Sequence, residues 1–129
     1  MLETEQDKAV SHLEFLGFDV KTGDKLLAAK HSSKPSFYIS FFDEGMVFTA
    51  LYTTSDAAKQ DPYRLLKYVN SVNEKTMVVR LFVNEAEDVY LAAFYPRAYD
   101  KLFFANFLEY WESDVRKMAA SSESSQMLQ

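Results

Sequence analysis

The only imidazole groups in the chain, His12 and His31, are the first candidates for acid–base chemistry or metal binding. His12 lies beside the apolar face of an expected helix, and His31 lies in the polar loop Lys30–Lys34. Neither histidine has a carboxylate at the short helical spacing that metal-binding motifs use. We therefore interpret both as structural or solvent-facing side chains, not as ligands or bases.

Other common catalytic arrangements are also missing from the sequence. There are no cysteines, and three glycines are too few for a phosphate-binding loop. The acidic loop Asn84–Asp88 lacks the ligand spacing and central glycine of a calcium loop. Glu109, Glu112 and Asp114 are expected on the solvated side of the last helix, as solubility charge. We therefore predict no catalytic residues, no metal site and no cofactor, and a protein that is not an enzyme.

The charge balance limits the possible partners. Nineteen acidic and fourteen basic residues give 129 residues a formal charge of -5, whereas a nucleic-acid-binding domain is usually basic. No apolar run approaches the roughly 20 residues of a membrane span. The acidic, polar residues 1–5 do not have the order of a signal peptide. We expect a soluble cytoplasmic protein that binds neither nucleic acid nor membrane.

Hydrophobic periodicity and turn residues predict the elements that position these groups. Asp61-Pro62 is typical of a helix start, with Asp as the N-cap and Pro in the first turn. Gly45 closes a short hairpin loop, and Val20–Ala29 could hold one strand or two. The expected helices are Thr4–Leu16, Pro62–Asn73 and Asp100–Met118, and the clear strands are Phe37–Phe42, Met46–Thr53, Met77–Val83 and Val89–Tyr95.

These elements predict an α+β fold in which three helices accompany an antiparallel sheet of about five strands, in the order α-β-β-β-α-β-β-α. We expect a single domain over residues 1–118. The Ser-rich residues 119–129 are expected to form a disordered tail.

Both faces of the predicted sheet carry large apolar side chains. Aromatic residues make up 16% of the chain, and strand alternation places many of them on what should be the weaker face. Those residues are Tyr38, Phe42, Val78, Phe82, Tyr90 and Phe94. A helix of the same chain could cover them, a second copy or a client segment could do so, or some tyrosines could stay exposed. The sequence leaves these three explanations open.

Two asparagines flank the apolar stripe of the central helix. Asn73 fits the C-terminal end of that helix. Asn70 could bond a neighbouring backbone group or a ligand. On the last helix Trp111 is the only tryptophan, and it could be either a core residue or an interface anchor.

The same stretch resembles the YbjN family. The pattern Leu65-Leu66, Val69-Asn70 and Val72-Asn73, followed by a strand, the acidic turn Asn84–Asp88, a second strand and an aromatic helix, carries the resemblance over residues 4–118. That family is similar in fold to the type III secretion chaperones. The resemblance implies a small, acidic, cytoplasmic bacterial protein, often a homodimer, that binds another polypeptide without turnover and has a chaperone-like or regulatory role.

Together these observations predict a non-enzymatic protein-binding module that buries apolar partner segments on aromatic patches. The partner is another polypeptide or a second copy of the chain. The expected contact residues are Tyr38, Phe42, Phe82, Tyr90 and Phe94, with Trp111 as a further candidate. The alternative is a small-molecule sensor with a pocket between the C-terminal helix and the sheet and Asn70 as a polar contact.

Overall fold

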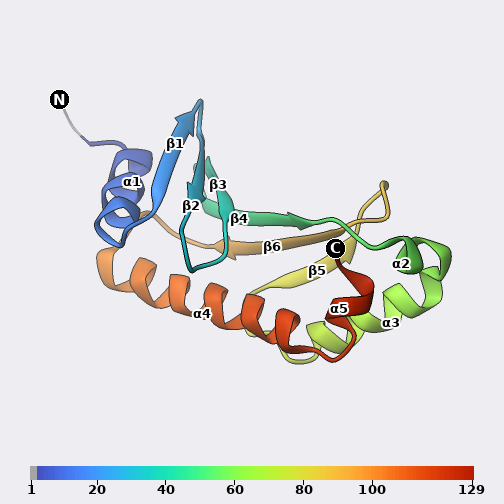
Figure 1. Cartoon of the computed structure of the whole chain (residues 1–129). Helices are drawn as coiled ribbons and strands as arrows, with labels where there is room; N and C mark the ends of the chain where they lie inside the picture. Colours follow the sequence, from blue (N-terminus) through green and yellow to red (C-terminus); the bar gives the residue numbers. More distant parts are fainter. Residues whose placement is uncertain (1–2) are drawn as a thin grey trace.

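The computed structural model describes residues 3–129, so the first two residues of the domain expected over 1–118 lie outside the described residues. The structure has two strands and two helices more than the four clear strands and three helices that the sequence patterns predicted (Figure 1). In chain order the elements are α1 (Glu5–Phe15), β1 (Asp19–Gly23), β2 (Leu26–Lys30), β3 (Phe37–Phe42), β4 (Gly45–Tyr52), α2 (Asp56–Gln60), α3 (Pro62–Asn73), β5 (Arg80–Val83), β6 (Val89–Tyr95), α4 (Lys101–Ala120) and α5 (Ser124–Met127).

The helix starts are set by the capping residues that the sequence shows. The Thr4 hydroxyl accepts from the Asp7 backbone N–H at 3.0 Å, and the Asp7 carboxylate accepts from the Thr4 N–H at 3.1 Å. This is a reciprocal capping box, which satisfies two N–H groups that the helix itself leaves free. Asp61 caps α3 ahead of Pro62, as predicted, and Ser55 caps the unpredicted short helix α2.

The six strands form one antiparallel sheet in the order β1-β2-β3-β4-β6-β5. The uncertain stretch Val20–Ala29 forms a complete hairpin, which raises the strand number from the expected five to six. Gly45 begins β4 at φ +152, and a Cβ there would lie 2.0 Å from the Tyr95 carbonyl oxygen. Only glycine therefore lets β4 pass this close to the end of β6.

The helices α1, α3 and α4 lie on one side of the sheet, where the core forms, and α2 lies beyond the end of β4 (Figure 1). The long helix α4 runs beneath β4, β5 and β6 (Figure 1). Its ring contacts are short: Phe48 of β4 lies 5.0 Å from Phe107 and 5.8 Å from Trp111 between centroids. Ala9 and Leu13 bury one side of α1 in the same core. The aromatic excess of the sequence therefore supplies one continuous core under one sheet face.

Asp114 corrects the expectation that it is surface charge, because its side chain is fully buried. Its carboxylate accepts from the backbone N–H groups of Met77, Val78 and Val79 at 2.8–3.0 Å. These three N–H groups point to α4 and not to a neighbouring strand, so residues 77–79 do not take part in the hydrogen bonding of the sheet. Strand β5 consequently begins at Arg80, three residues later than the predicted start at Met77.

Residues 119–129 are packed against the domain and do not form the expected disordered tail. Met127 is fully buried, Leu128 pairs with Thr54, and Ser124 shares a hydrogen bond of 2.9 Å with Tyr68. The Ser-rich composition suggested disorder, but the two apolar residues near its end and the Tyr68 hydroxyl on α3 fix it. We call residues 121–129 the C-terminal strap.

Candidate functional site

The side of the sheet opposite the helices is the first candidate site, because large apolar side chains stand on it. We call this surface the open aromatic face. Strand alternation places Phe37, Ile39 and Phe41 in the core and their neighbours outside. The open aromatic face consists of Tyr38, Phe42, Leu51, Phe82, Tyr90 and Phe94, with Leu26 at its margin. Apart from the half-buried Tyr90, the six are between 40 and 58% exposed.

The strand register joins these residues into two apolar groups. Leu51 of β4 is paired with Tyr90 of β6, and Tyr90 is paired with Phe82 of β5. The rings of Phe82 and Tyr90 lie 5.0 Å apart between centroids. A partner segment would therefore meet three adjacent apolar side chains at this end of the strands.

The second apolar group lies at the other end of the same strands. Phe94 of β6 is paired with Val47 of β4, and Phe42 precedes the tight turn at Gly45. Between the two groups, the paired residues Thr49 and Ala92 form a row of small side chains. Tyr38 of β3 continues this row on one side and Arg80 of β5 continues it on the other, so the centre of the open aromatic face carries one ring and one cation.

Acidic turns stand at both ends of this face. The β3–β4 turn carries Asp43 and Glu44, which are exposed, and the β5–β6 turn carries Glu85 and Glu87. Asp88 closes the second turn. The Lys59 ammonium at 2.9 Å, followed by the Thr54 backbone N–H, lowers the pKa of its carboxyl below the ordinary value. The acidic turns therefore favour basic groups at the two ends of a partner segment, whereas Arg80 places a cation on the face between them.

The two histidines have structural partners. The imidazole Nδ1 of His31 accepts from the Ser33 backbone N–H at 3.0 Å, and its ring packs on Phe18. His12 is bonded to the Tyr99 hydroxyl at 2.8 Å and packs on Phe104. Within residues 3–129 no group of three His, Asp or Glu side chains could hold a metal ion. In the same part of the chain no helix has the length and apolar character to cross a membrane.

The structure brings together five of the residues predicted to contact a partner and separates the other two. Tyr38, Phe42, Phe82, Tyr90 and Phe94 all stand on the open aromatic face. Trp111 is 0% exposed in the core, so the idea of an interface anchor there is wrong: its ring packs between Phe37 and Phe48. Asn70 is exposed on α3, away from the space between α4 and the sheet.

The space between α4 and the sheet, where the alternative prediction placed a ligand pocket, is packed core in residues 3–129. Phe48, Phe104, Phe107 and Trp111 fill it with contacting rings. Asn73, not Asn70, has the structural role: its side-chain amide donates to the Leu81 carbonyl at 3.0 Å and accepts from the Leu81 N–H at 2.9 Å. It thereby joins the end of α3 to β5.

Sequence reasoning missed Leu51 and the exposed residues of α1 and α4. Leu51 alternates onto the same face as Thr49, so its position was readable from the strand period. Phe15 and Leu102 fall outside the apolar stripes of their helices. That departure from helical periodicity was the signal that they face away from the core.

An antiparallel six-stranded sheet with its helices on one side, and with this element order, is the YbjN-like and type III secretion chaperone-like fold. The predicted α+β class and the predicted resemblance are therefore confirmed. The structure of YbjN from E. coli, a proposed transcription regulator, matches with a TM-score of 0.76 at 15% sequence identity, over 96% of this chain and 95% of that one.

A second solved structure is the heterodimeric ExoU–SpcU complex of the type III secretion system of Pseudomonas aeruginosa. It matches with a TM-score of 0.58 at 15% identity, over 84% of this chain and 93% of the matched chain. At such identities the likeness shows a shared fold. No family model and no curated protein sequence matches the chain.

Proposed function

We propose that this protein is a non-enzymatic binding module that holds an apolar segment of another polypeptide against its open aromatic face. One observation carries the proposal: Tyr38, Phe42, Phe82 and Phe94 stand together, 40–58% exposed, on a sheet face that no helix of residues 3–129 covers. Contiguous apolar patches beyond a few hundred Å² are uncommon on monomers and mark interaction sites.

The charge pattern favours a partner of different sequence over a second copy. Acidic turns at Asp43-Glu44 and at Glu85–Asp88 border both ends of the face, and the chain carries a net charge of -5. A second copy would bring further negative charge, whereas a segment with basic residues on each side of an apolar stretch would complement the turns. The shared fold supports this choice, since SpcU forms a heterodimeric complex with ExoU.

Peptide binding tests the proposal. The probe is a fluorescein-labelled apolar peptide of twelve residues with two lysines at each end, and the matched probe carries glutamates instead. We expect the lysine probe to bind more tightly. The double substitution Phe82→Ser and Phe94→Ser removes two half-exposed rings worth about 1 kcal/mol each, which predicts a Kd about 10- to 30-fold weaker.

Tyr63→Ser is the control variant, because Tyr63 is an exposed aromatic residue on α3 and not on the sheet. Its Kd should equal that of the unaltered protein. Light scattering on all three proteins adds the oligomeric state. A dimer that dissociates only in the Phe82, Phe94 variant would identify a second copy as the occupant and overturn the assignment to a different polypeptide. Unchanged peptide binding by that variant would refute the site itself.

A further inference from the structure

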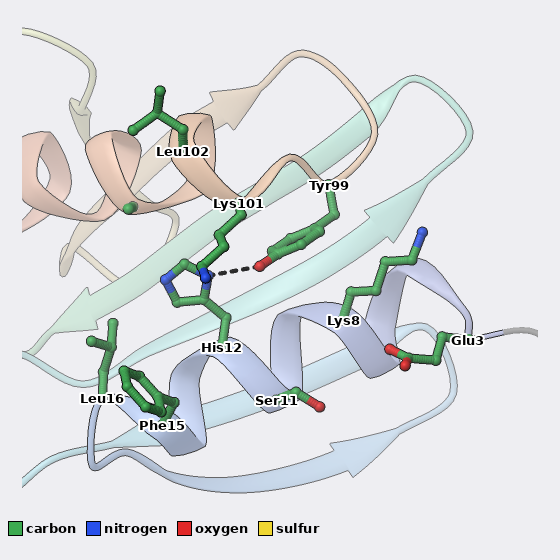
Figure 2. A pocket seen from close by; sticks show the side chains of 10 residues that line it. Glu3, Lys8, Ser11, His12, Phe15, Leu16, Tyr99, Lys101 and Leu102 are labelled. Carbon is green, nitrogen blue, oxygen red and sulfur yellow. Dashed lines mark hydrogen bonds between the residues drawn. The ribbon is translucent and has the colours of Figure 1, made fainter.

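A groove separates helix α1 from the first turns of α4, on the opposite side of the molecule's core from the open aromatic face. Its volume is about 630 Å³, within the range of small-molecule sites. Figure 2 shows the side chains that line it: Lys8 and Ser11 at one end of α1, Phe15 and Leu16 at the other, and Leu102 on α4.

The apolar end of the groove is formed by side chains that the core does not use. Phe15 is 89% exposed and Leu102 is 71% exposed. On α1, residues 8, 11, 12 and 15 recur at three- and four-residue spacing, so they share one face, while Ala9 and Leu13 face the core. The groove is therefore lined by a face of α1 that is separate from its buried face, and Phe15 and Leu16 make that face apolar at one end.

His12 supplies a hydrogen-bond donor in the middle of the groove. Its Nδ1 lies 2.8 Å from the Tyr99 hydroxyl. When the phenol donates this bond, Nδ1 is the acceptor and the proton of the neutral ring is on Nε2. Burial and then the nearby Lys101 ammonium lower the pKa of His12, which favours this neutral ring. The Nε2–H group is then the free donor.

Lys101 supplies a cation beside that donor. Within residues 3–129 no carboxylate lies at ion-pair distance from Lys101. It also occupies the first position of the 20-residue helix α4, where a positive charge opposes the helix dipole. Lys8, in contrast, has Glu5 at 3.6 Å, and Glu3 lies at the same end of the groove. An anionic group next to Lys101 would compensate the positive charge that this side chain places at the N-terminal end of α4.

We propose that this groove binds a small monocarboxylic acid with an apolar body of medium chain length. The carboxylate would accept from His12 Nε2–H and pair with Lys101, and the hydrocarbon would lie along Phe15, Leu16 and Leu102. The single uncompensated cation fits one negative charge. The mostly apolar lining disfavours phosphate esters and other highly charged ligands.

Calorimetric titration with octanoate and with octanol, both below their aggregation concentrations, tests the proposal. We expect octanoate to bind about 2- to 5-fold more tightly than octanol, as a partly exposed ion pair predicts. Lys101→Met keeps the apolar stem and should abolish this difference. Leu102→Asp should weaken both ligands. Lys67→Met, on α3, is the matched control and should change neither.

The His12 imidazole gives a second readout, followed by NMR. The charged groups around it are Lys8 and Glu5 of α1, Glu3 before that helix, Lys101 of α4 and the Asp100 cap that precedes it, with the Tyr99 hydroxyl as hydrogen-bond partner. Octanoate should raise the pKa of His12, because it offsets Lys101, whereas octanol should not.

Equal affinity for octanoate and octanol would overturn the proposal, as would the absence of binding by either at millimolar concentration. Amide shifts confined to the open aromatic face would also overturn it. The Phe82→Ser, Phe94→Ser variant should bind octanoate normally, so this test and the peptide test can fail independently.

Discussion

Replacing Asp114 offers a direct test of how one buried carboxylate holds the sheet to α4. Its Oδ2 accepts from the N–H groups of Met77, Val78 and Val79 at 3.0, 2.8 and 2.9 Å, and its Oδ1 accepts again from Met77 at 2.9 Å. Asp114→Ala removes every acceptor. Asp114→Asn keeps the size but turns one oxygen into an NH₂ group, which donates and cannot accept.

The magnitude follows from these contacts. Hydrogen bonds to charged groups are worth about 1.5–3 kcal/mol each, and a buried donor left unpaired costs about 1–3 kcal/mol. The Val79 N–H is buried, whereas those of Met77 and Val78 are partly accessible and would regain water. We therefore expect Asp114→Ala to lower the free energy of unfolding by about 3–5 kcal/mol. Asp114→Asn should lower it by nearly as much.

The assay is urea denaturation followed by tryptophan fluorescence. Trp111 is the only tryptophan and is 0% exposed, so its emission reports loss of the core around it. With a slope of about 1–3 kcal/mol per molar urea, the midpoint should fall by more than 1 M. Glu109→Ala, one exposed carboxylate on the same helix, is the control and should shift the midpoint little. A loss below about 1 kcal/mol in Asp114→Asn would refute the anchoring role.

Three further perturbations have defined outcomes. Gly45→Ala should lower the free energy of unfolding by more than about 2 kcal/mol in the same urea assay, because the added Cβ would lie 2.0 Å from the Tyr95 carbonyl oxygen. An unchanged free energy of unfolding would show that β4 can shift away from Tyr95 freely. The pKa of His12 in the folded protein lies below its ordinary 6.5, so the unfolded chain binds more protons as the pH falls below 6.5, and the free energy of unfolding declines there. His12→Gln should flatten this dependence of the free energy of unfolding on pH. An unchanged slope would contradict the lowered pKa of His12. The Arg64 guanidinium bonds Glu123 at 2.7 and 3.0 Å and holds the pKa of that carboxyl below its ordinary value. The contribution of this contact to stability is therefore present above the unfolded pKa near 4.5 and is lost as the pH falls through the lower folded pKa. Amide exchange in residues 121–129 should accelerate in acid, and Arg64→Met should show the fast exchange already at neutral pH.

The shared face of the five interface candidates was predictable because side chains alternate strictly along a strand. Counting in twos from Phe37 separates Tyr38 and Phe42 from the core positions without knowledge of the neighbouring strands. Helix starts at Thr4 and Asp61 were equally local, because a cap requires only residues three places apart. The fold class and the pairing of strands within each hairpin were therefore predictable from short segments, whereas the pairing of β4 with β6 joins residues some 40 positions apart.

Other features depended on residues far apart in the chain. The burial of Asp114 requires the N–H groups of residues 77–79, some 35 positions earlier, and no local pattern distinguishes it from Glu109. The strap is fixed by Tyr68 and Thr54, so its composition alone predicted disorder wrongly. Whether Trp111 was core or anchor was decided by Phe37 and Phe48 across the sheet.

The sequence by itself determined which side chains share a face, because backbone geometry fixes that period within each segment. Only the tertiary structure decided which face the helices cover, because covering it needs the packing of α4 against side chains of β3, β4 and β6 together. It left the face of Tyr38, Phe42, Phe82, Tyr90 and Phe94 uncovered and closed the other over Trp111. The same packing produced the groove beside His12, which lies between α1 and α4, two helices some ninety residues apart in the chain.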